Sequence, residues 1–97
     1  MAKTLGQGTG RQMRSGLDKE PKYTPRQGQF LVFIHYYTKL NGRPPAEGDM
    51  VRYFKITPPS AHRMVVTLEQ RRLIERVPGQ ARSIRLLVAR EDLPDLD

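Results

Sequence analysis

The sequence predicts a mainly α-helical domain that ends in a small β-hairpin. Three observations lead to this prediction: apolar residues recur every three or four positions over residues 30–40, Thr-Pro pairs open two segments, and the apolar period shortens after residue 72. With 97 residues, of which 37% are apolar and 28% charged, the chain has room for one domain with a small core. We place this folding unit at residues 24–90.

The first helix is expected to begin at Pro25, since proline suits the first helical position. Thr24 can cap this start, and Gln27 can reach back to complete a capping box. Asn41-Gly42 should end the helix, and Pro44-Pro45 prevents it from continuing. Its apolar face consists of Phe30, Phe33, Ile34, Tyr37 and Leu40.

Two further helices follow. A short one fits residues 47–54, although Ala46 is a weak cap for its start. Thr57-Pro58 opens the third helix as a cap followed by a first-position proline, and we expect it over residues 58–72. Its residues spaced for burial are Ala61, Met64 or Val65, and Leu68. A turn of a few residues between these helices indicates a helix-turn-helix.

In residues 73–88 the spacing of apolar residues changes from helical to alternating. Residues 73–77 and 84–88 are rich in β-branched and apolar side chains, whereas residues 78–83, Pro-Gly-Gln-Ala-Arg-Ser, have the composition of a turn. These segments predict two strands joined by a six-residue wing loop. Three helices followed by such a hairpin predict a winged helix-turn-helix.

Basic residues outnumber acidic residues by 17 to 10, and the excess is unevenly spread. The folding unit has a net charge of +8. Residues 1–23, with a net charge of +3, contain too few apolar side chains to form a core, so we predict a flexible basic arm. Residues 91–97, with a net charge of −4, predict an acidic tail. Such a positive domain favours a polyanionic partner.

The composition also disfavours several classes of function. The chain has no cysteine, and its two histidines, His35 and His62, lie far apart in the predicted fold. We therefore expect no metal, no cofactor, no small-molecule ligand and no enzymatic activity. No apolar run is long enough to cross a membrane, and no secretory signal opens the sequence. The expected location is cytoplasmic and nucleoid-associated.

The residues between Pro44 and Leu87 contain the landmarks of one known family. They are Gly42 just before this segment, Pro44, Pro45, Thr57, Pro58, Ala61, Leu68, Ile74, Glu75, Val77, Gly79, Arg82 and the run Ile84-Arg85-Leu86-Leu87. In this order and without a gap they resemble the amino-terminal DNA-binding domain of the LexA repressor family. The opening Thr24-Pro25-Arg26-Gln27 is similar to the Thr-x-Arg-Gln that begins the family's first helix. The resemblance implies a winged helix that binds duplex DNA.

The chain departs from that family in three respects. The family continues into a self-cleaving domain with a Ser-Lys dyad, whereas this sequence ends at Asp97. We therefore expect a stand-alone domain, with neither self-cleavage nor dimerisation through the missing part. Lys55 stands where LexA proteins often have glycine. The residues of the third helix also differ, so the LexA operator is not carried over.

The third helix has an outward face opposite its buried residues, and a helix in the major groove presents its first turns to the bases. The resemblance implies that Pro59, Ser60, His62 and Arg63 lie nearest to them. Arg63 suits a bidentate contact to guanine, and His62 can donate to a base acceptor or a phosphate. A solvated face is the alternative, and for His62 and Ser60 the two interpretations are evenly matched. The predicted base contacts are Pro59, Ser60, His62, Arg63, Val66 and Thr67.

Phosphate contacts need positive charge or backbone amides beside this face. The first turn of the first helix, the second helix, the start of the third and the wing can supply them. The alternative is that these arginines only solubilise the domain, or, for Arg72, complement the carboxyl end of the third helix. The predicted backbone contacts are Arg26, Arg52, Thr57, Gln80, Arg82 and Arg85.

The sequence thus predicts a sequence-specific duplex-DNA-binding protein that acts as a small transcriptional regulator. Helix 58–72 would read the major groove, and wing 78–83 would contact the backbone or the minor groove. The alternative is a winged-helix protein–protein interaction module that does not bind DNA. Reading two half-sites would take a homodimer, and cooperative binding of monomers on DNA is the other arrangement left open.

Overall fold

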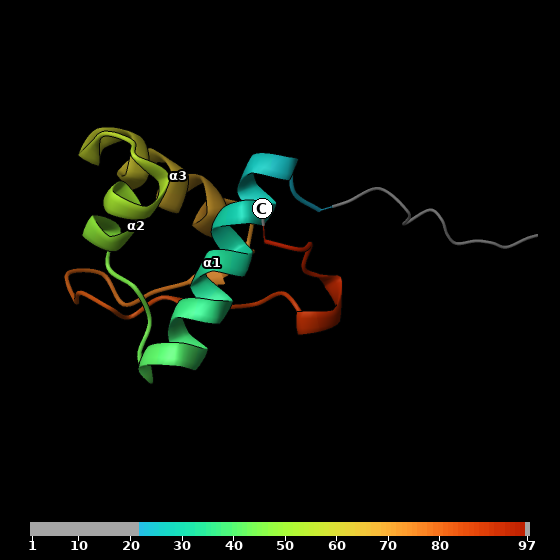
Figure 1. The fold of residues 1–97 in the computed structure, drawn as a ribbon. Helices are drawn as coiled ribbons and strands as arrows, with labels where there is room; N and C mark the ends of the chain where they lie inside the picture. The colour runs from blue at the N-terminus through green and yellow to red at the C-terminus, as the bar shows by residue number, and fades with distance from the viewer. Residues whose placement is uncertain (1–21, 97) are drawn as a thin grey trace, which may run out of the picture.

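The computed structural model describes residues 22–96. It confirms the predicted class: three helices and a two-stranded antiparallel sheet form a winged helix-turn-helix (Figure 1). In Figure 1, α2 and α3 lie together on one side of α1, and the last described residues lie on the other. The elements are α1 Pro25–Asn41, α2 Glu47–Phe54, α3 Pro58–Gln70, β1 Ile74–Glu75, β2 Arg85–Leu86 and the 3-10 helix η2 Arg90–Asp92.

The start and end of α1 follow from local chemistry. The Thr24 hydroxyl accepts from the Gln27 backbone N–H at 3.1 Å, and the Gln27 side chain accepts from the Thr24 N–H at 2.9 Å. This reciprocal pair is the predicted capping box. At the other end Gly42 adopts a left-handed φ of 74° and donates its N–H to the carbonyl of Thr38. Glycine adopts this conformation without steric cost, so the helix ends where the sequence predicts.

The weak cap at Ala46 is compensated by Asp49. One carboxylate oxygen of Asp49 accepts the Ala46 backbone N–H at 2.8 Å, which satisfies a donor at the start of α2. At the end of α2, Lys55 takes a left-handed φ of 56° and donates its N–H to the carbonyl of Val51. The chain therefore turns sharply into α3, although this position has a β-carbon.

The predicted helix over residues 58–72 was two residues too long, because α3 ends at Gln70. Arg72 adopts a left-handed φ of 61° and donates its N–H to the Glu69 carbonyl, and Leu73 donates to the Leu68 carbonyl. This pair of bonds forms a Schellman motif, which reverses the chain and directs Leu73 into the core. Helix ends of this kind usually have glycine in the left-handed position, so the sequence with Arg72 there does not predict the end of α3.

The hairpin has shorter strands than residues 73–77 and 84–88 predicted. Ile74 pairs with Leu86 and Glu75 with Arg85, and one further bond joins the Leu87 N–H to the Leu73 carbonyl. Beyond Glu75 the side chain of Ser83 replaces the ladder: its hydroxyl accepts from the Val77 N–H at 2.9 Å. The same hydroxyl lies 2.8 Å from the Gln80 carbonyl, to which it can donate. The loop is thus held by a side chain instead of by strand pairing.

The core lies where α1, α3 and the hairpin meet. Val65, Leu68 and Ala61 are fully buried on the inner face of α3, as the spacing predicted. The aromatic rings of Phe30 and Phe54 stack with centroids 3.9 Å apart and join α1 to the end of α2. The main cluster of buried residues comprises Phe30, Leu31, Phe33, Ile34, Met50, Ala61, Val65, Leu68, Leu73, Ile74 and Ile84.

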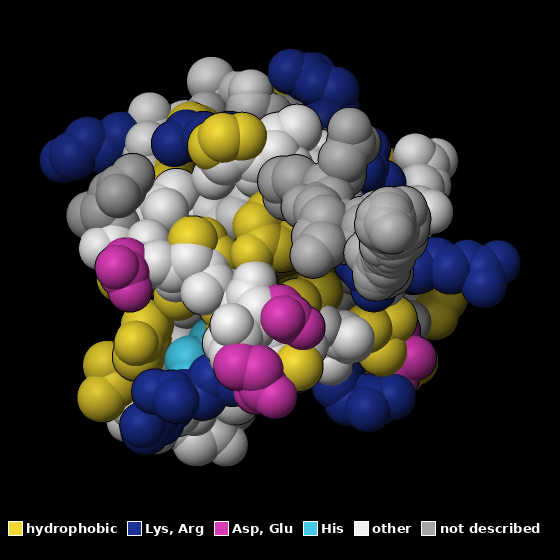
Figure 2. Space-filling view, turned by 90° about the vertical axis from the view of Figure 1, so that its right-hand side faces the viewer, with side chains coloured by type: hydrophobic (Ala, Val, Ile, Leu, Met, Phe, Trp, Pro, Cys, Tyr) yellow, Lys and Arg dark blue, Asp and Glu magenta, His cyan; other side chains and the backbone are white. Residues whose placement is uncertain are grey.

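Segments at both ends of the folding unit also pack on α1. Tyr23, assigned to the arm, donates from its hydroxyl to the Asp92 carbonyl, and Gln29 donates to the Asp95 carbonyl at 2.9 Å. Leu93 packs against the core. The packed structure therefore extends beyond the boundaries at residues 24 and 90, and residues 1–21 of the predicted arm lie outside the described residues. Figure 2 looks onto this side and shows acidic side chains near the middle of the face, with basic ones around its edge.

Candidate nucleic-acid interface

The outward face of α3 carries most of the predicted base contacts. Pro59, His62 and Arg63 are exposed, whereas Ser60, Val66 and Thr67 are half-buried. Gln70, which the sequence analysis did not select, is exposed and follows Arg63 by seven residues, so it lies on the same face. The helical spacing could have identified it. The structure thus brings the predicted residues together along one helix, with His62 toward the edge nearest α2.

The first turn of α3 is held by its own side chains. The Thr57 hydroxyl accepts the Ser60 N–H at 3.3 Å and lies 2.9 Å from the Ser60 hydroxyl, while a guanidinium nitrogen of Arg63 donates to that hydroxyl at 3.4 Å. Pro58 and Pro59 have no N–H, and the Ala61 N–H is bonded to the Thr57 carbonyl. Within the first turn of α3, Ser60 and Ala61 therefore use their amides internally, and Thr57 acts as a helix cap.

His62 contacts the beginning of α2. Its Nδ1 lies 3.0 Å from a carboxylate oxygen of Glu47, although the two residues are 15 positions apart. Nη1 of Arg76 lies 3.6 Å from the same oxygen, and its Nε donates to Glu69 at 3.0 Å. This His62 cluster, formed by His62, Glu47, Arg76 and Glu69, joins α2, α3 and the residue after β1. No local sequence pattern indicates a contact between such distant positions.

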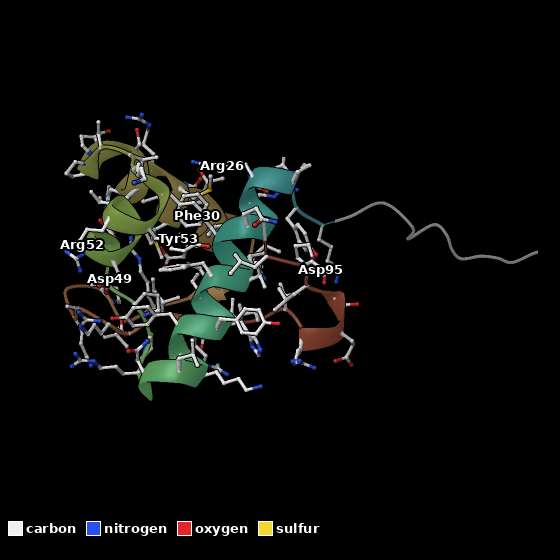
Figure 3. All side chains as sticks on the ribbon, viewed as in Figure 1. Arg26, Phe30, Asp49, Arg52, Tyr53 and Asp95 are labelled. Atoms are coloured by element: carbon white, nitrogen blue, oxygen red, sulfur yellow. The ribbon has the colours of Figure 1, made fainter. Side chains whose placement is uncertain are left out.

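Arg26 is an exposed cation in a fixed position. Its guanidinium carbon lies 5.3 Å from the ring centroid of Phe30 and 5.1 Å from that of Phe54 (Figure 3). Both distances are within the range of cation–π attraction. Because Phe54 is the last residue of α2, the two rings place this charge beside the turn that leads into α3. The phosphate contact of Arg26 stays a prediction.

Arg52 extends from α2 into solvent, with 72% of its side chain exposed. Its Nη2 donates to Asp49 at 2.5 Å, so one edge of the guanidinium is paired and the other remains accessible. Figure 3 shows Arg52 and Asp49 together on α2, on the opposite side of α1 from Asp95. An exposed arginine of this kind can reach a phosphate without breaking its existing contact.

Arg82, a predicted backbone contact, is directed toward α1 and α2. Instead of extending from the wing, Nη1 lies 3.0 Å from Asp49 Oδ2, 3.2 Å from the Tyr37 hydroxyl and 3.3 Å from the Pro44 carbonyl. The hydrogen bond to Tyr37 raises the pKa of Arg82, burial opposes this, and Asp49 adds to the increase. Arg82 therefore fixes the wing to α1 and α2 through Nη1, with 31% of its side chain still exposed, and its contact with a phosphate stays a prediction.

Asp49 is the buried partner in this arrangement, with 8% of its side chain exposed. Burial alone would raise its pKa, but the hydrogen bond from Ala46 and the charges of Arg82 and Arg52 lower it below the ordinary value. The carboxylate is thus ionised and accepts hydrogen bonds from a helix start and from two arginines. We call Asp49, Arg82 and Tyr37 the wing anchor.

The other two predicted contacts of the hairpin, Gln80 and Arg85, are exposed. The Gln80 N–H is bonded to the Val77 carbonyl, which leaves its side chain in solvent at the tip. Arg85 pairs with Glu75 directly across the two strands, and 68% of its side chain is exposed. Both can approach a nucleic-acid backbone, but Arg85 would have to share its charge with Glu75.

Outside this interface, a groove of about 800 Å³ lies between the second half of α1 and the hairpin, lined by residues such as Ile34, Lys39, Val77 and Leu86. No residue of α3 lines it. Within residues 22–96 no cluster of His, Asp or Glu side chains could hold a metal ion. Among the described helices, none has the length and apolar character needed to cross a bilayer.

The comparison with protein families decides what kind of winged helix this is. The model of the LexA DNA-binding domain matches residues 20–83, more than half of the chain. The chain belongs to the LexA DNA-binding domain family. The match includes α1, α2, α3 and the wing loop, so it covers most of the elements described above.

Individual relatives agree with this assignment. The chain is 39% identical over 72 residues to the LexA repressor of Thermosipho melanesiensis, covering 74% of this chain and 36% of that protein. It is 42% identical over 64 residues to the LexA repressor of Thermosipho africanus and 35% identical over 65 residues to that of Bartonella quintana. These matches cover 66% of this chain, and 32% and 27% of the two relatives. The chain thus spans about a third of the length of these LexA repressors.

Proposed function

We propose that this LexA-family domain binds double-stranded DNA sequence-specifically and regulates transcription. The outward face of α3, with Arg63 at its centre, would enter the major groove. Arg26 and Arg52 on one side, and Gln80 and Arg85 on the wing, would contact the backbone, and the wing loop can also reach a minor groove. A protein with this role acts on chromosomal DNA, so association with the nucleoid belongs to the same proposal.

The observation that carries this proposal is the exposure of Arg63 on the outward face of a helix whose opposite face is fully buried. An arginine in this place has five donors and can bind the two acceptors of guanine at once. The fixed guanidinium of Arg26 gives further support, because it is positioned before any ligand arrives.

The test is binding-site selection from random duplexes, followed by fluorescence anisotropy on the selected site. Arg63→Ala should weaken binding to that site by about 1–3 kcal/mol and relax the preference at one base pair. Arg26→Ala should weaken binding to all duplexes alike and make the salt dependence shallower by about one unit. Arg90→Ala, which removes the same charge from η2, is the matched control and should change neither the base preference nor the salt dependence.

Absence of a salt-dependent complex at low ionic strength would reject DNA binding, because several phosphate contacts produce a steep salt slope. The protein would then be better described as a winged-helix protein–protein interaction module. The selected sites also test oligomeric state. Two half-sites about one helical turn apart would indicate a homodimer, and a single half-site would indicate a monomer.

A further inference from the structure

The hydrogen bond between His62 and Glu47 fixes the position of a proton. A neutral imidazole has one N–H donor and one acceptor nitrogen, whereas an ionised carboxylate can only accept. Since Nδ1 of His62 lies 3.0 Å from Oε2 of Glu47, the proton of the neutral ring must be on Nδ1. The other nitrogen, Nε2, then has a lone pair and no proton.

The surroundings keep Glu47 in place as the acceptor. It is the first residue of α2, and Nη1 of Arg76 lies 3.6 Å from the oxygen that faces His62. Arg76 is itself only 26% exposed and is held by Glu69 at 3.0 Å. Arg76 is the positively charged partner of this carboxylate, so the His62 cluster presents Glu47 to the imidazole as an acceptor.

The free nitrogen of His62 is accessible. The His62 side chain is 57% exposed, and Nε2 has no partner among residues 22–96. His62 also lies in the second turn of α3, one position before Arg63. In a helix placed in the major groove, the edge of the imidazole that carries Nε2 is the part left to meet a base.

We propose that Glu47 is a specificity-determining residue that acts through His62, an inference that rests on the proposed DNA-binding function. By holding the proton on Nδ1, Glu47 makes Nε2 an acceptor. In the major groove the donors are the amino groups of adenine and cytosine, whereas guanine and phosphate offer acceptors. His62 therefore selects adenine or cytosine on the strand that it faces, instead of a base acceptor or a phosphate.

The pair contributes little to folding, which makes the proposal testable. Exposed ion pairs and hydrogen bonds of this kind stabilise proteins only slightly, so substitutions of either residue should leave the fold intact. Glu47 also places a negative charge next to phosphates, so its removal should not weaken DNA binding overall. Loss of selectivity without loss of affinity is the result that separates this role from a structural one.

The first experiment observes the proton in the DNA-free protein. ¹⁵N NMR of the two ring nitrogens at pH 8 distinguishes the two neutral tautomers and the charged form. Wild-type His62 should have its proton on Nδ1, and Glu47→Ala should move the population toward Nε2. His35, whose Nε2 accepts from Arg90 at 3.4 Å, is an internal reference that should not change.

The second experiment is binding-site selection at the same pH. Wild-type protein should prefer adenine or cytosine over guanine or thymine at one position of one strand by about five- to tenfold. Glu47→Ala should lose this preference while the preference set by Arg63 persists. His62→Ala should lose the same preference, and the double variant should lose no more. Glu75→Ala removes an equal charge from the hairpin and should leave base preferences unchanged.

The outcomes separate the two proposals. A proton on Nε2, or on both nitrogens, in wild-type protein would overturn the role of Glu47 even if DNA binds. An unchanged preference in Glu47→Ala would also overturn it. If no duplex binds at any ionic strength, the proposed function fails and the selectivity fails with it, while the NMR measurement still reports whether Glu47 holds the proton.

Discussion

At the scale of single residues, three basic residues have a left-handed backbone conformation. They are Lys55, Arg72 and Arg82, with φ of 56°, 61° and 57°. Residues with a β-carbon adopt this conformation at a cost of roughly 1–2 kcal/mol each. In Arg82 the side chain compensates by joining the wing anchor. Lys55 has no such contact among the described residues, so its strain is the easiest to relieve.

Lys55→Gly should therefore raise the free energy of unfolding by about 1 kcal/mol, because glycine adopts the left-handed conformation without strain. Urea denaturation followed by circular dichroism measures this. Lys39→Gly, within α1, is the matched control and should lower the same free energy by about 1 kcal/mol. If both variants were equally destabilised, the left-handed strain at Lys55 would be negligible.

The wing anchor predicts how stability depends on pH. Because the pKa of Asp49 is lowered in the folded protein, its contribution is fully present above the unfolded pKa, near 3.9, and is lost as the pH falls through the lower folded value. Denaturation at pH 6, 4 and 3 should show wild-type stability falling on acidification. Asp49→Asn should be less stable at pH 6 and should depend less on pH.

Asp95→Asn removes an equal charge on the other side of α1 and is the control for this experiment (Figure 3). It should keep most of the wild-type decline. If Asp49→Asn declined as steeply as the wild-type protein, the ionised carboxylate would not be what holds the wing.

At the scale of elements, the sequence predicts the ends of a helix or strand only where residues close in sequence determine them. The start of α1 follows from residues three positions apart, so its capping box was predicted. The end of α3 depends on where Leu73 is buried, and the short strands depend on a contact between Ser83 and Val77. These causes depend on tertiary contacts, so the spacing of apolar residues along the sequence could not predict them.

Gly28 lies in α1 where the segments before α1 and after η2 pack closely against this helix. A β-carbon at Gly28 would lie 2.8 Å from a ring carbon of Tyr23 and 3.0 Å from Pro94, so neighbouring groups would have to move. We expect Gly28→Ala to lower the free energy of unfolding by about 1 kcal/mol, since overpacking outweighs the gain in helix propensity.

Gly48→Ala in α2 is the matched substitution. Its β-carbon would meet only the end of Arg52, at 3.7 Å, so roughly 0.5–1 kcal/mol of helix propensity should be gained. Thermal unfolding of both variants measures the contrast. Equal shifts in Tm would show that the contact over Gly28 does not limit packing.

At the scale of the whole molecule, the candidate interface was predicted as a surface but not as a set of contacts. The outward face of α3 follows from helical spacing, and its exposure is as expected. The partners of Arg82 and His62 are 33 and 15 residues away, and only the packed fold brings them together. Net charge indicates that a polyanion can bind. The contacts between residues far apart in sequence determine which basic side chains are accessible to it.

The acidic residues of η2 and of the segment that follows it predict an effect on binding without an effect on folding. Its contacts with Tyr23 and Gln29 use the backbone carbonyls of Asp92 and Asp95, so the combined substitution Glu91→Gln, Asp92→Asn, Asp95→Asn should leave them intact. We expect this variant to bind non-cognate duplexes several-fold more tightly at low salt, with the gain shrinking as the Debye length falls below about 10 Å.

Anisotropy at several salt concentrations measures this change, and circular dichroism checks the fold. Unchanged affinity at the lowest salt would mean that these carboxylates lie too far from bound DNA to act. Deleting residues 91–97 would be a poorer experiment, because Leu93 and Pro94 pack on the domain and their loss would disturb α1.

The contact over Gly28 has a mechanical consequence. Tyr23 and Pro94 meet there, so the first and last described segments leave the domain at one place, on the side of α1 away from α2 (Figure 1). A pulling force applied through these two segments would act on this junction first and peel the ends apart one contact at a time. The helix-turn-helix would bear the load only after the junction had opened, so an optical-tweezers trace should show a small early step before the main rupture.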